Sequence, residues 1–282
     1  MAMKLGAFDI HPLSDGRFRL DGGAMFGVVP KVLWEKCCPV DDLNRIPLSL
    51  TTLLIRAHGK NILVDTGLGA KEDGKFHRMF AVEREPTLMD SLKRHGLDAQ
   101  DIHLVINTHL HFDHAGGNTR RDRQGRLRPA FPNARYIVQH DEFQDAACAN
   151  ERTRASYRQD DFGPISNQWE FLHGDTELLP GLTAVVTAGH TRCHQGVKIE
   201  SEGRVAFFLG DLIPTVSHLP LPYIMGYDLF PVQTLETKRW ILDRAFEERW
   251  LLLFEHDPLV QAGYVRRDQE GKYFLREVTA WQ

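Results

Sequence analysis

Short apolar runs recur along the whole chain, and turn sequences containing glycine, proline or asparagine separate them. Runs of this length are typical of strands, and two of them joined by a tight turn predict a hairpin. We expect single strands at 104–106 and 136–138. We expect strand pairs at 4–10 with 17–20 (around a turn at 14–16), 48–57 with 62–65, 176–179 with 182–187, and 197–200 with 204–209.

Three longer segments have the spacing of helices, at 86–95, 140–150 and 232–250. The first of them ends at His95-Gly96, which is a typical helix stop. The last places Leu235, Leu242 and Ala245 on one face, as an amphipathic helix packed on a core would. Strands alternating with helices predict an α/β layered fold. Because no linker or low-complexity tract interrupts the pattern, we expect one domain over 1–282, with no element predicted for 151–168.

Composition narrows the class of protein without identifying it. Of 282 residues, 42% are hydrophobic and 26% charged, which is ordinary for a globular protein with a sizeable core. The net charge of −4 gives no general attraction to nucleic acid or to anionic membranes. No apolar run is long enough to span a bilayer, and charged residues interrupt the first 20 positions, so no signal peptide is expected. We therefore expect a cytoplasmic protein without a membrane partner.

The densest candidate chemistry follows the predicted strand 104–106. His109, His111, Asp113 and His114 lie within six positions. If the extended backbone continues past the strand, His109 and His111 point to the same side, because side chains alternate along a strand. Imidazole and carboxylate together suit zinc and its first-row neighbours. This segment therefore predicts a metal site.

Three further candidate ligands occur in the same context, each at the end of an apolar run. They are His190 after 184–187, Asp211 after 206–209, and His256 after 251–254. A lone histidine is more often an ordinary core or surface residue, but the repetition of one arrangement argues against coincidence. Strand ends on a rigid sheet can hold convergent ligands accurately.

The motif HxHxDH, followed by Gly189-His190, Gly210-Asp211 and the late His256, resembles the metallo-β-lactamase superfamily over most of the chain. The glycine-rich stretch from Asp21 to Pro30 resembles more narrowly the YtnP-type quorum-quenching lactonases. The resemblance implies a four-layer αββα sandwich, in which helices flank two mixed β-sheets and the metals lie at the shared edge of the sheets.

The resemblance also implies a role for each candidate residue. One metal is held by His109, His111 and His190, the second by Asp113, His114 and His256, and Asp211 bridges them. Two divalent ions are expected, zinc first, with iron, manganese or cobalt as alternatives. Asp65, in an Asp-Thr-Gly sequence, and His194 are expected to brace the ligands from behind; a helix cap is the alternative for Asp65.

The implied reaction is hydrolysis of a lactone (ester) ring, as in N-acyl-homoserine lactones. A hydroxide shared by the two ions attacks the carbonyl carbon, while Asp113 orients this nucleophile and transfers a proton. His111 occupies the place where flavodiiron oxidoreductases of this fold have glutamate, so a redox di-iron role is not expected. Better-known lactonases carry a tyrosine three residues after the bridging aspartate, and Pro214 stands there in this chain.

Two apolar segments that proline and glycine interrupt, 22–34 and 212–225, suit a pocket for an acyl chain, although core packing explains the first equally well. The expected pocket residues are Met25, Phe26, Leu212, Tyr223 and Tyr227. Of these, Tyr223 or Tyr227 could replace the absent tyrosine, so Tyr223 is also a catalytic candidate. We expect a small-molecule substrate with an acyl chain, and a homodimer is compatible with the sequence.

Two other functions remain open at this point. The first is another di-zinc hydrolase of the same fold, such as a glyoxalase-II-like thioesterase or an organophosphate hydrolase. The second is a nuclease, because five arginines gather in the insertion at 118–128. Asp122 interrupts this cluster and no aromatic residue interleaves it, so a solvated hairpin without nucleic acid is favoured.

Overall fold

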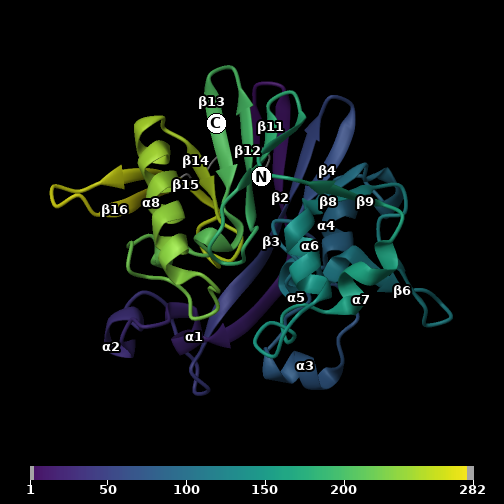
Figure 1. Cartoon of the computed structure of the whole chain (residues 1–282), viewed down its shortest axis with the longest axis horizontal. Helices are drawn as coiled ribbons and strands as arrows, with labels where there is room; N and C mark the ends of the chain where they lie inside the picture. Colours follow the sequence, from purple (N-terminus) through teal and green to yellow (C-terminus); the bar gives the residue numbers. More distant parts are fainter. Residues whose placement is uncertain (1–2, 278–282) are drawn as a thin grey trace.

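The computed structural model describes residues 3–277. Within them, two seven-stranded sheets face each other and helices cover the outer faces (Figure 1). The first sheet has the order β1-β2-β3-β4-β5-β8-β9. Its strands are Met3–Leu5, Phe8–Asp21, Arg45–Ala57, Lys60–Val64, Leu104–Ile106, Arg135–Gln139 and Trp169–Leu172. The strands from β4 to β9 pair in parallel, and the remaining pairs are antiparallel, so the sheet is mixed.

The second sheet continues in sequence order from β10 to β16. Its strands are Thr176–Leu179, Leu182–Val186, Gln195–Ser201, Arg204–Phe208, Leu251–Leu253, Ala262–Arg267 and Tyr273–Glu277. Only the pairing of β13 with β14 is parallel among the ladders of this sheet that the structure describes. Both sheets are therefore mixed, as expected for the αββα sandwich.

The core between the sheets consists of inward-facing aliphatic and aromatic side chains from both of them, such as Ile10, Ile55, Ile199 and Phe208, all essentially without exposed surface. Burial of this apolar surface is the main term that holds the two sheets together. Strands of each sheet alternate inward and outward positions, so their other faces must be covered by helices.

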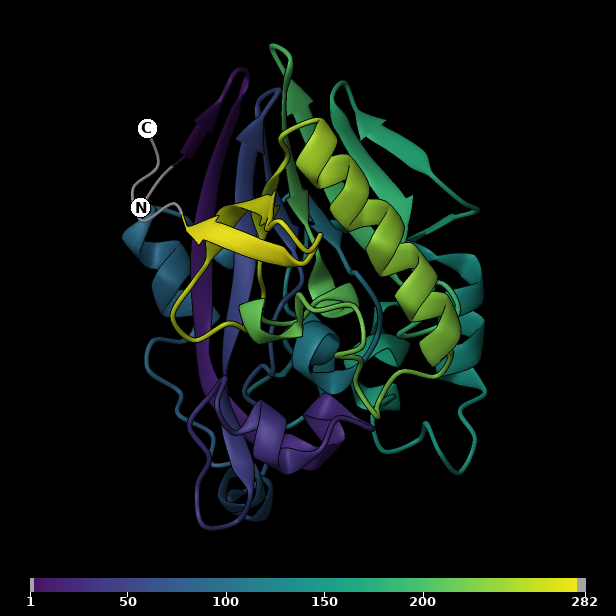
Figure 2. The same cartoon turned by 90° about the vertical axis from the view of Figure 1, so that its left-hand side faces the viewer.

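The outer helices lie where this alternation requires them. On the first sheet these are α4 (Leu88–Arg94) and α6 (His140–Ala147), and on the second it is α8 (Pro231–Glu247), which runs diagonally across the strands (Figures 1 and 2). Leu92 belongs to one buried apolar cluster with Leu54 and Val105 of the first sheet. The short helices α1, α2, α3, α5 and α7 span Gly22–Phe26, Lys31–Trp34, Gly74–Met79, Phe112–Ala115 and Gln159–Phe162.

The arginine-rich insertion forms a two-stranded hairpin of β6 (Thr119–Arg121) and β7 (Leu127–Pro129) outside both sheets. Asp122 accepts hydrogen bonds from the guanidinium groups of Arg126 and Arg128, at 2.9 and 3.5 Å. The aspartate that interrupts the arginine cluster is thus paired within the hairpin itself.

One predicted turn is wrong. Residues 14–16 do not reverse the chain but form a bulge inside the long strand β2, where the register with β3 shifts between Ser14 and Arg17. The hairpin turn lies earlier, at Gly6 between β1 and β2. The bulge exists because the buried Asp15 carboxylate turns toward the backbone N–H groups of Leu88 and Gly69, at 2.8 and 3.0 Å, contacts that lie far away in sequence.

Candidate metal centre

One half of the site is delivered by the first sheet. After β5 the chain bends at Thr108, passes through His109 and His111, and then forms the single turn of α5, which carries Asp113 and His114. The turn packs closely on the loop after β4: a side chain at Gly117 would collide with the carbonyl oxygen of Thr66. The glycines that follow the motif are therefore required by the close approach of two backbone segments.

The other half comes from the second sheet. His190 follows β11, Asp211 lies in a short 3-10 turn after β13, and His256 follows β14, so all three leave the same edge of the sheet. Backbone hydrogen bonds join the sheets here, from Gln195 N to Thr108 O (2.9 Å) and from Ser49 N to His256 O (3.0 Å). The sheet edges that carry the candidate ligands are thereby fixed to each other.

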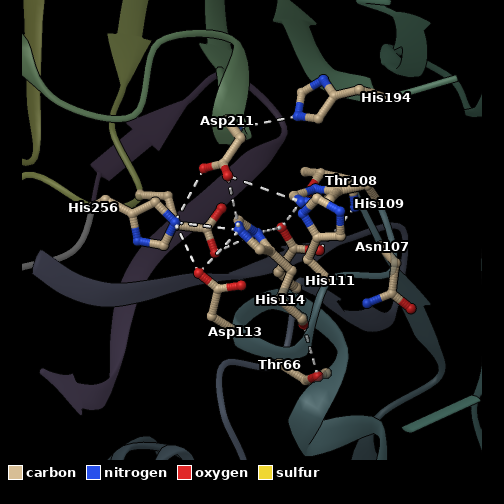
Figure 3. Close-up of polar contacts among 12 residues, drawn as sticks. Thr66, Asn107, Thr108, His109, His111, Asp113, His114, His194, Asp211 and His256 are labelled. Carbon is tan, nitrogen blue, oxygen red and sulfur yellow. Dashed lines mark hydrogen bonds and ion pairs between the residues drawn. The ribbon is translucent and has the colours of Figure 1, made fainter. Parts of the chain in front are cut away.

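All seven predicted ligands come together at this edge, and none is more than 7% exposed. Figure 3 shows His109, His111, Asp113, His114, Asp211 and His256. Ligand atoms of one group lie within 4.8 Å of one another, as do those of a second group. The groups are His109, His111, His190 and Asp211, and Asp113, His114 and His256. Asp211 contacts both: its Oδ2 lies 3.2 Å from His190 Nε2 and its Oδ1 lies 3.1 Å from His256 Nε2.

The histidine ring nitrogens at the centre are arranged to bind cations and not to form hydrogen bonds with one another. Nε2 of His256 and Nε2 of His114 lie 3.2 Å apart, while Nδ1 of His256 donates to Ser49 O at 2.8 Å. Nε2 of His109 is buried and has no hydrogen-bond partner among the residues that the structure describes. An imidazole that donates from its outer nitrogen presents a lone pair at the inner one. The donor set therefore fits two divalent metal ions, one in each group.

Asp65 and His194 lie behind the ligands, where the sequence prediction placed them. Asp65 Oδ2 accepts from Thr108 Oγ1 (2.7 Å) and from His114 Nδ1 (3.2 Å), and its Oδ1 accepts from Thr108 N (2.8 Å). His194 Nε2 accepts from the backbone N–H of Asp211 at 3.1 Å. Burial, followed by the charge of His190, lowers the pKa of His194 to about 3, which leaves it neutral and able to accept.

Two further carboxylates touch the ligands and were missed from the sequence. Asp228 Oδ1 accepts from His190 Nδ1 at 2.8 Å, and Glu255 Oε1 lies 3.1 Å from His114 Nδ1. Glu255 directly precedes His256 at a strand end, so the same pattern that identified His256 could have included it. Asp228 lies in a loop without any pattern that would have distinguished it.

The charges within the cluster favour the binding of a cation. Burial, with the neighbouring histidines His114 and His111, lowers the pKa of His109 well below its ordinary value. Burial also opposes protonation of His114, but the carboxylates of Glu255, Asp211 and Asp113 outweigh it and raise its pKa. Burial likewise acts against ionisation of Asp211, yet the surrounding histidines hold its pKa well below the usual range. Ionised carboxylates at the centre thus favour any cation placed among them.

A cavity of about 170 Å³ opens directly onto this cluster. Its walls are mostly apolar, and its floor includes Asp113 and Asp211. Two of the five predicted pocket residues, Met25 and Tyr227, line it. Met225 also lines it, at the end of the segment 212–225 that the sequence predicted as a pocket wall. The apolar walls that the sequence did not identify include Leu20, Leu48, Phe80 and Phe112.

Phe26, Leu212 and Tyr223 do not line the cavity, which corrects the prediction for these three. Phe26 is fully buried and stacks between Trp34 and His218, at ring distances of 5.2 and 4.5 Å. Leu212 packs into the core under α8. Tyr223 meets Phe26 edge-on at 5.9 Å and is not among the residues that line the cavity. The segment 22–34 folds into two short helices that bury the rings of Phe26 and Trp34, so core packing, the alternative explanation, accounts for these two residues. Val28, Val32 and Leu33 of the same segment are exposed.

Comparison with known families agrees with this geometry. The sequence pattern of the metallo-beta-lactamase superfamily matches residues 46–256. The chain therefore belongs to this superfamily, and the expected fold class is confirmed.

Among curated relatives, the N-acyl homoserine lactonase of Bacillus thuringiensis is 34% identical over 209 residues, covering 70% of this chain and 76% of the relative. An N-acyl homoserine lactonase of Bacillus sp is 32% identical over 167 residues, and this match spans 56% of the chain but only 60% of that protein.

Among solved structures, a probable metal-dependent hydrolase from Staphylococcus aureus superposes with a TM-score of 0.89 at 34% identity, over 99% of this chain and 100% of the other. An N-acyl homoserine lactone hydrolase with the product N-hexanoyl-L-homoserine at its catalytic metal center superposes with a TM-score of 0.67 at 25% identity, covering 92% and 95%. The predicted likeness to quorum-quenching lactonases is thereby confirmed.

Proposed function

We propose that this chain is a metal-dependent hydrolase that opens the ring of N-acyl homoserine lactones. The observation that carries the proposal is the apolar cavity that opens directly onto the clustered histidines and aspartates. Apolar walls suit an acyl chain, and a few convergent polar groups at the floor suit a lactone ring. The Bacillus lactonases and the product-bound hydrolase support the same substrate class.

Zinc is the ion that we propose for both groups, because histidine nitrogens with carboxylate oxygens are its usual donors. One ion would be held by His109, His111 and His190, and the other by Asp113, His114 and His256, with Asp211 between them. Asp65 and His194 would fix the orientation of this set through His114 and Asp211. We also propose that 1–282 act as one domain, since each group draws ligands from both sheets.

When bound, the two ions supply Lewis acidity, which lowers the pKa of a water molecule and polarises the substrate carbonyl. Asp113 stands at the cavity floor, with Oδ2 3.7 Å from Nε2 of both His114 and His256. From there its carboxylate accepts a proton from the attacking water, whose oxygen bonds to the carbonyl carbon. As the ring C–O bond breaks, Asp113 returns the proton to the departing ring oxygen.

Tyr227 is the residue that we propose in place of the tyrosine absent at position 214. It lines the cavity, whereas Tyr223 does not. Burial, with the charges of Asp21 and Asp113, raises the pKa of Tyr227 to about 12, so its hydroxyl stays protonated and able to donate. A hydroxyl donor in this wall would bind the substrate carbonyl oxygen as negative charge develops on it.

The test is a substrate panel on the purified, zinc-loaded protein: N-hexanoyl-homoserine lactone, a thioester and a phosphotriester, each with and without a chelator. We expect ring opening of the lactone, loss of this activity on chelation, and its recovery when zinc is returned. Asp211→Asn should abolish it. Faster turnover of the thioester or the phosphotriester than of any lactone would assign the site to one of the other hydrolases and overturn the substrate proposal.

A further inference from the structure

Glu142 is a buried carboxylate beside the candidate metal centre that is not itself among the clustered ligands. It lies in the first turn of α6 and has no exposed surface. Its Oε1 accepts hydrogen bonds from Leu110 N at 3.1 Å and from the Tyr157 hydroxyl at 2.9 Å. Its Oε2 accepts from Thr191 Oγ1 at 2.6 Å. One side chain thus joins three segments that are far apart in sequence.

Each of these segments carries a histidine of the first group or packs on one. Leu110 is the residue between His109 and His111, and Thr191 directly follows His190. The ring of Tyr157 packs on the ring of His111 at 4.7 Å, and the backbones of these two residues pair. By contrast, none of the described hydrogen bonds of Glu142 reaches the segments of His114 or His256.

The same carboxylate supports one wall of the cavity. Ala155 and Ser156, which line the cavity, immediately precede Tyr157. Ser156 O accepts from Phe112 N at 3.0 Å, so this wall is attached to the metal-binding segment as well. A shift of Tyr157 would therefore move the wall and His111 together.

We propose that Glu142 is a positioning residue that holds His109, His111 and His190 in register and, through Tyr157, fixes the cavity wall at Ala155–Ser156. Hydrogen bonds to a carboxylate are stronger than those between neutral groups, and a buried network binds its members most tightly when every donor has a partner. The inference rests on the proposed function only for its kinetic consequence, because its consequence for metal binding can be measured without any substrate.

The decisive variants differ in how much of the network they remove. Glu142→Ala leaves all three donors without an acceptor. Glu142→Gln keeps one oxygen for Leu110 and Tyr157, and its amide can donate to the Thr191 hydroxyl, which can rotate to accept. Tyr157→Phe removes one hydrogen bond and keeps the ring on His111. Asp15→Asn is the matched control, since Asp15 is equally buried and accepts from Arg84, Leu88 N and Gly69 N on another part of the first sheet.

The measurement is competition between the zinc-loaded protein and a chromophoric chelator, which reports how many ions leave and at what chelator strength. In Glu142→Ala we expect one of the two ions to bind roughly 10- to 100-fold more weakly, the range known for residues that orient metal ligands, and the other to be retained as in the wild type. Glu142→Gln should restore most of the loss, and Tyr157→Phe should lie between. In the cobalt-substituted protein, only one of the two sets of visible bands should change.

Two results would overturn the proposal. The first is that the affinity for both ions falls equally, in proportion to the lost stability, as in Asp15→Asn. The second is that the affinity for neither ion falls in any Glu142 variant. If Glu142→Ala does not fold, Tyr157→Phe and Thr191→Val carry the same test with one hydrogen bond removed each. A wild type that binds two ions but opens no lactone would refute the proposed function and leave this inference standing. If lactonase activity is present, KM for long acyl chains should rise more in Tyr157→Phe than KM for short ones.

Discussion

Replacing Lys238 by methionine is expected to change how the stability of the protein depends on pH. Lys238 lies on α8, is 1% exposed, and donates from Nζ to the carbonyl oxygens of Pro220 and Tyr223 at 2.8 and 2.9 Å. Burial lowers its pKa from 10.5 to about 7, opposed only by the charge of Asp228. A charged amine is therefore unfavourable in the folded state, while the two carbonyl groups still require a donor.

The direction of the effect follows from proton counting. Below pH 7 the folded and unfolded chains both hold the proton, and the penalty of burying the charge, on the order of 5 kcal/mol, is complete. Between pH 7 and 10.5 the unfolded chain holds one proton more, so the unfolding free energy rises with pH by about 1.4 kcal/mol per unit. Lys238→Met lacks this pH-dependent contribution to the unfolding free energy. It also leaves two carbonyl groups without a hydrogen-bond donor, which costs about 1–3 kcal/mol of stability for each group.

The assay is urea unfolding of the zinc-loaded wild type and variant at pH 7.5, 8.5 and 9.5. The difference in unfolding free energy, wild type minus variant, should increase by about 2.5 kcal/mol over this range, with the wild type the more stable protein at pH 9.5. Contributions that both proteins share cancel in the difference. Lys93→Met, at an exposed position of α4, controls for the loss of a lysine. A Lys238 difference that stays constant within about 0.5 kcal/mol would refute the reasoning.

Three shorter predictions concern the site and its surroundings. Asp228→Ala removes the acceptor that orients His190 and should lower the affinity for one of the two ions roughly 10- to 100-fold, as measured by chelator competition. Unchanged affinity for both ions would contradict this. Tyr227→Phe should lower kcat by about 10²-fold with zinc content unchanged, as measured with a short-chain lactone, whereas an unaltered kcat would exclude the proposed carbonyl donor. Replacing the exposed Arg126 and Arg128 together by alanine should leave kcat/KM within about twofold, because exposed ion pairs contribute little; a large loss would give the β6–β7 hairpin a role in the reaction.

The elements and ligands that could be predicted from the sequence are those whose signal is local. The strand at 104–106 and the hairpin of β12 and β13 were visible because their apolar runs and their turn residues are adjacent in the chain. His190, Asp211 and His256 could be linked to the His109 motif because each stands at the end of such a run. Their convergence then follows from the geometry of sheets, since strands that run in the same direction end at one edge.

The remaining features depend on contacts between distant segments. Ser14-Asp15-Gly16 has the composition of a turn, and only the pairing of Asp15 with Arg84 and Leu88 makes it a bulge. Phe26 and Leu212 belong to apolar segments close to the site, but apolar residues line cavities and fill cores alike. Glu142 lies in a polar first turn of a predicted helix, where a carboxylate is ordinary, and nothing in the local pattern indicates that it is buried.

The loop between 219 and 230 shows why the substrate wall and the metal ligands cannot be varied independently. Lys238 fixes this loop at Pro220 and Tyr223, and the loop then supplies Met225 and Tyr227 to the cavity. The next residue, Asp228, holds His190. A substitution that moves this loop to admit a larger acyl group must therefore also displace the acceptor of a candidate metal ligand. Leu48, in the opposite wall on β3, is under the same constraint, because the next residue, Ser49, accepts from His256 Nδ1 at 2.8 Å. Leu20, on β2, makes no described hydrogen bond to a candidate ligand, so changes of substrate range without loss of metal are expected there.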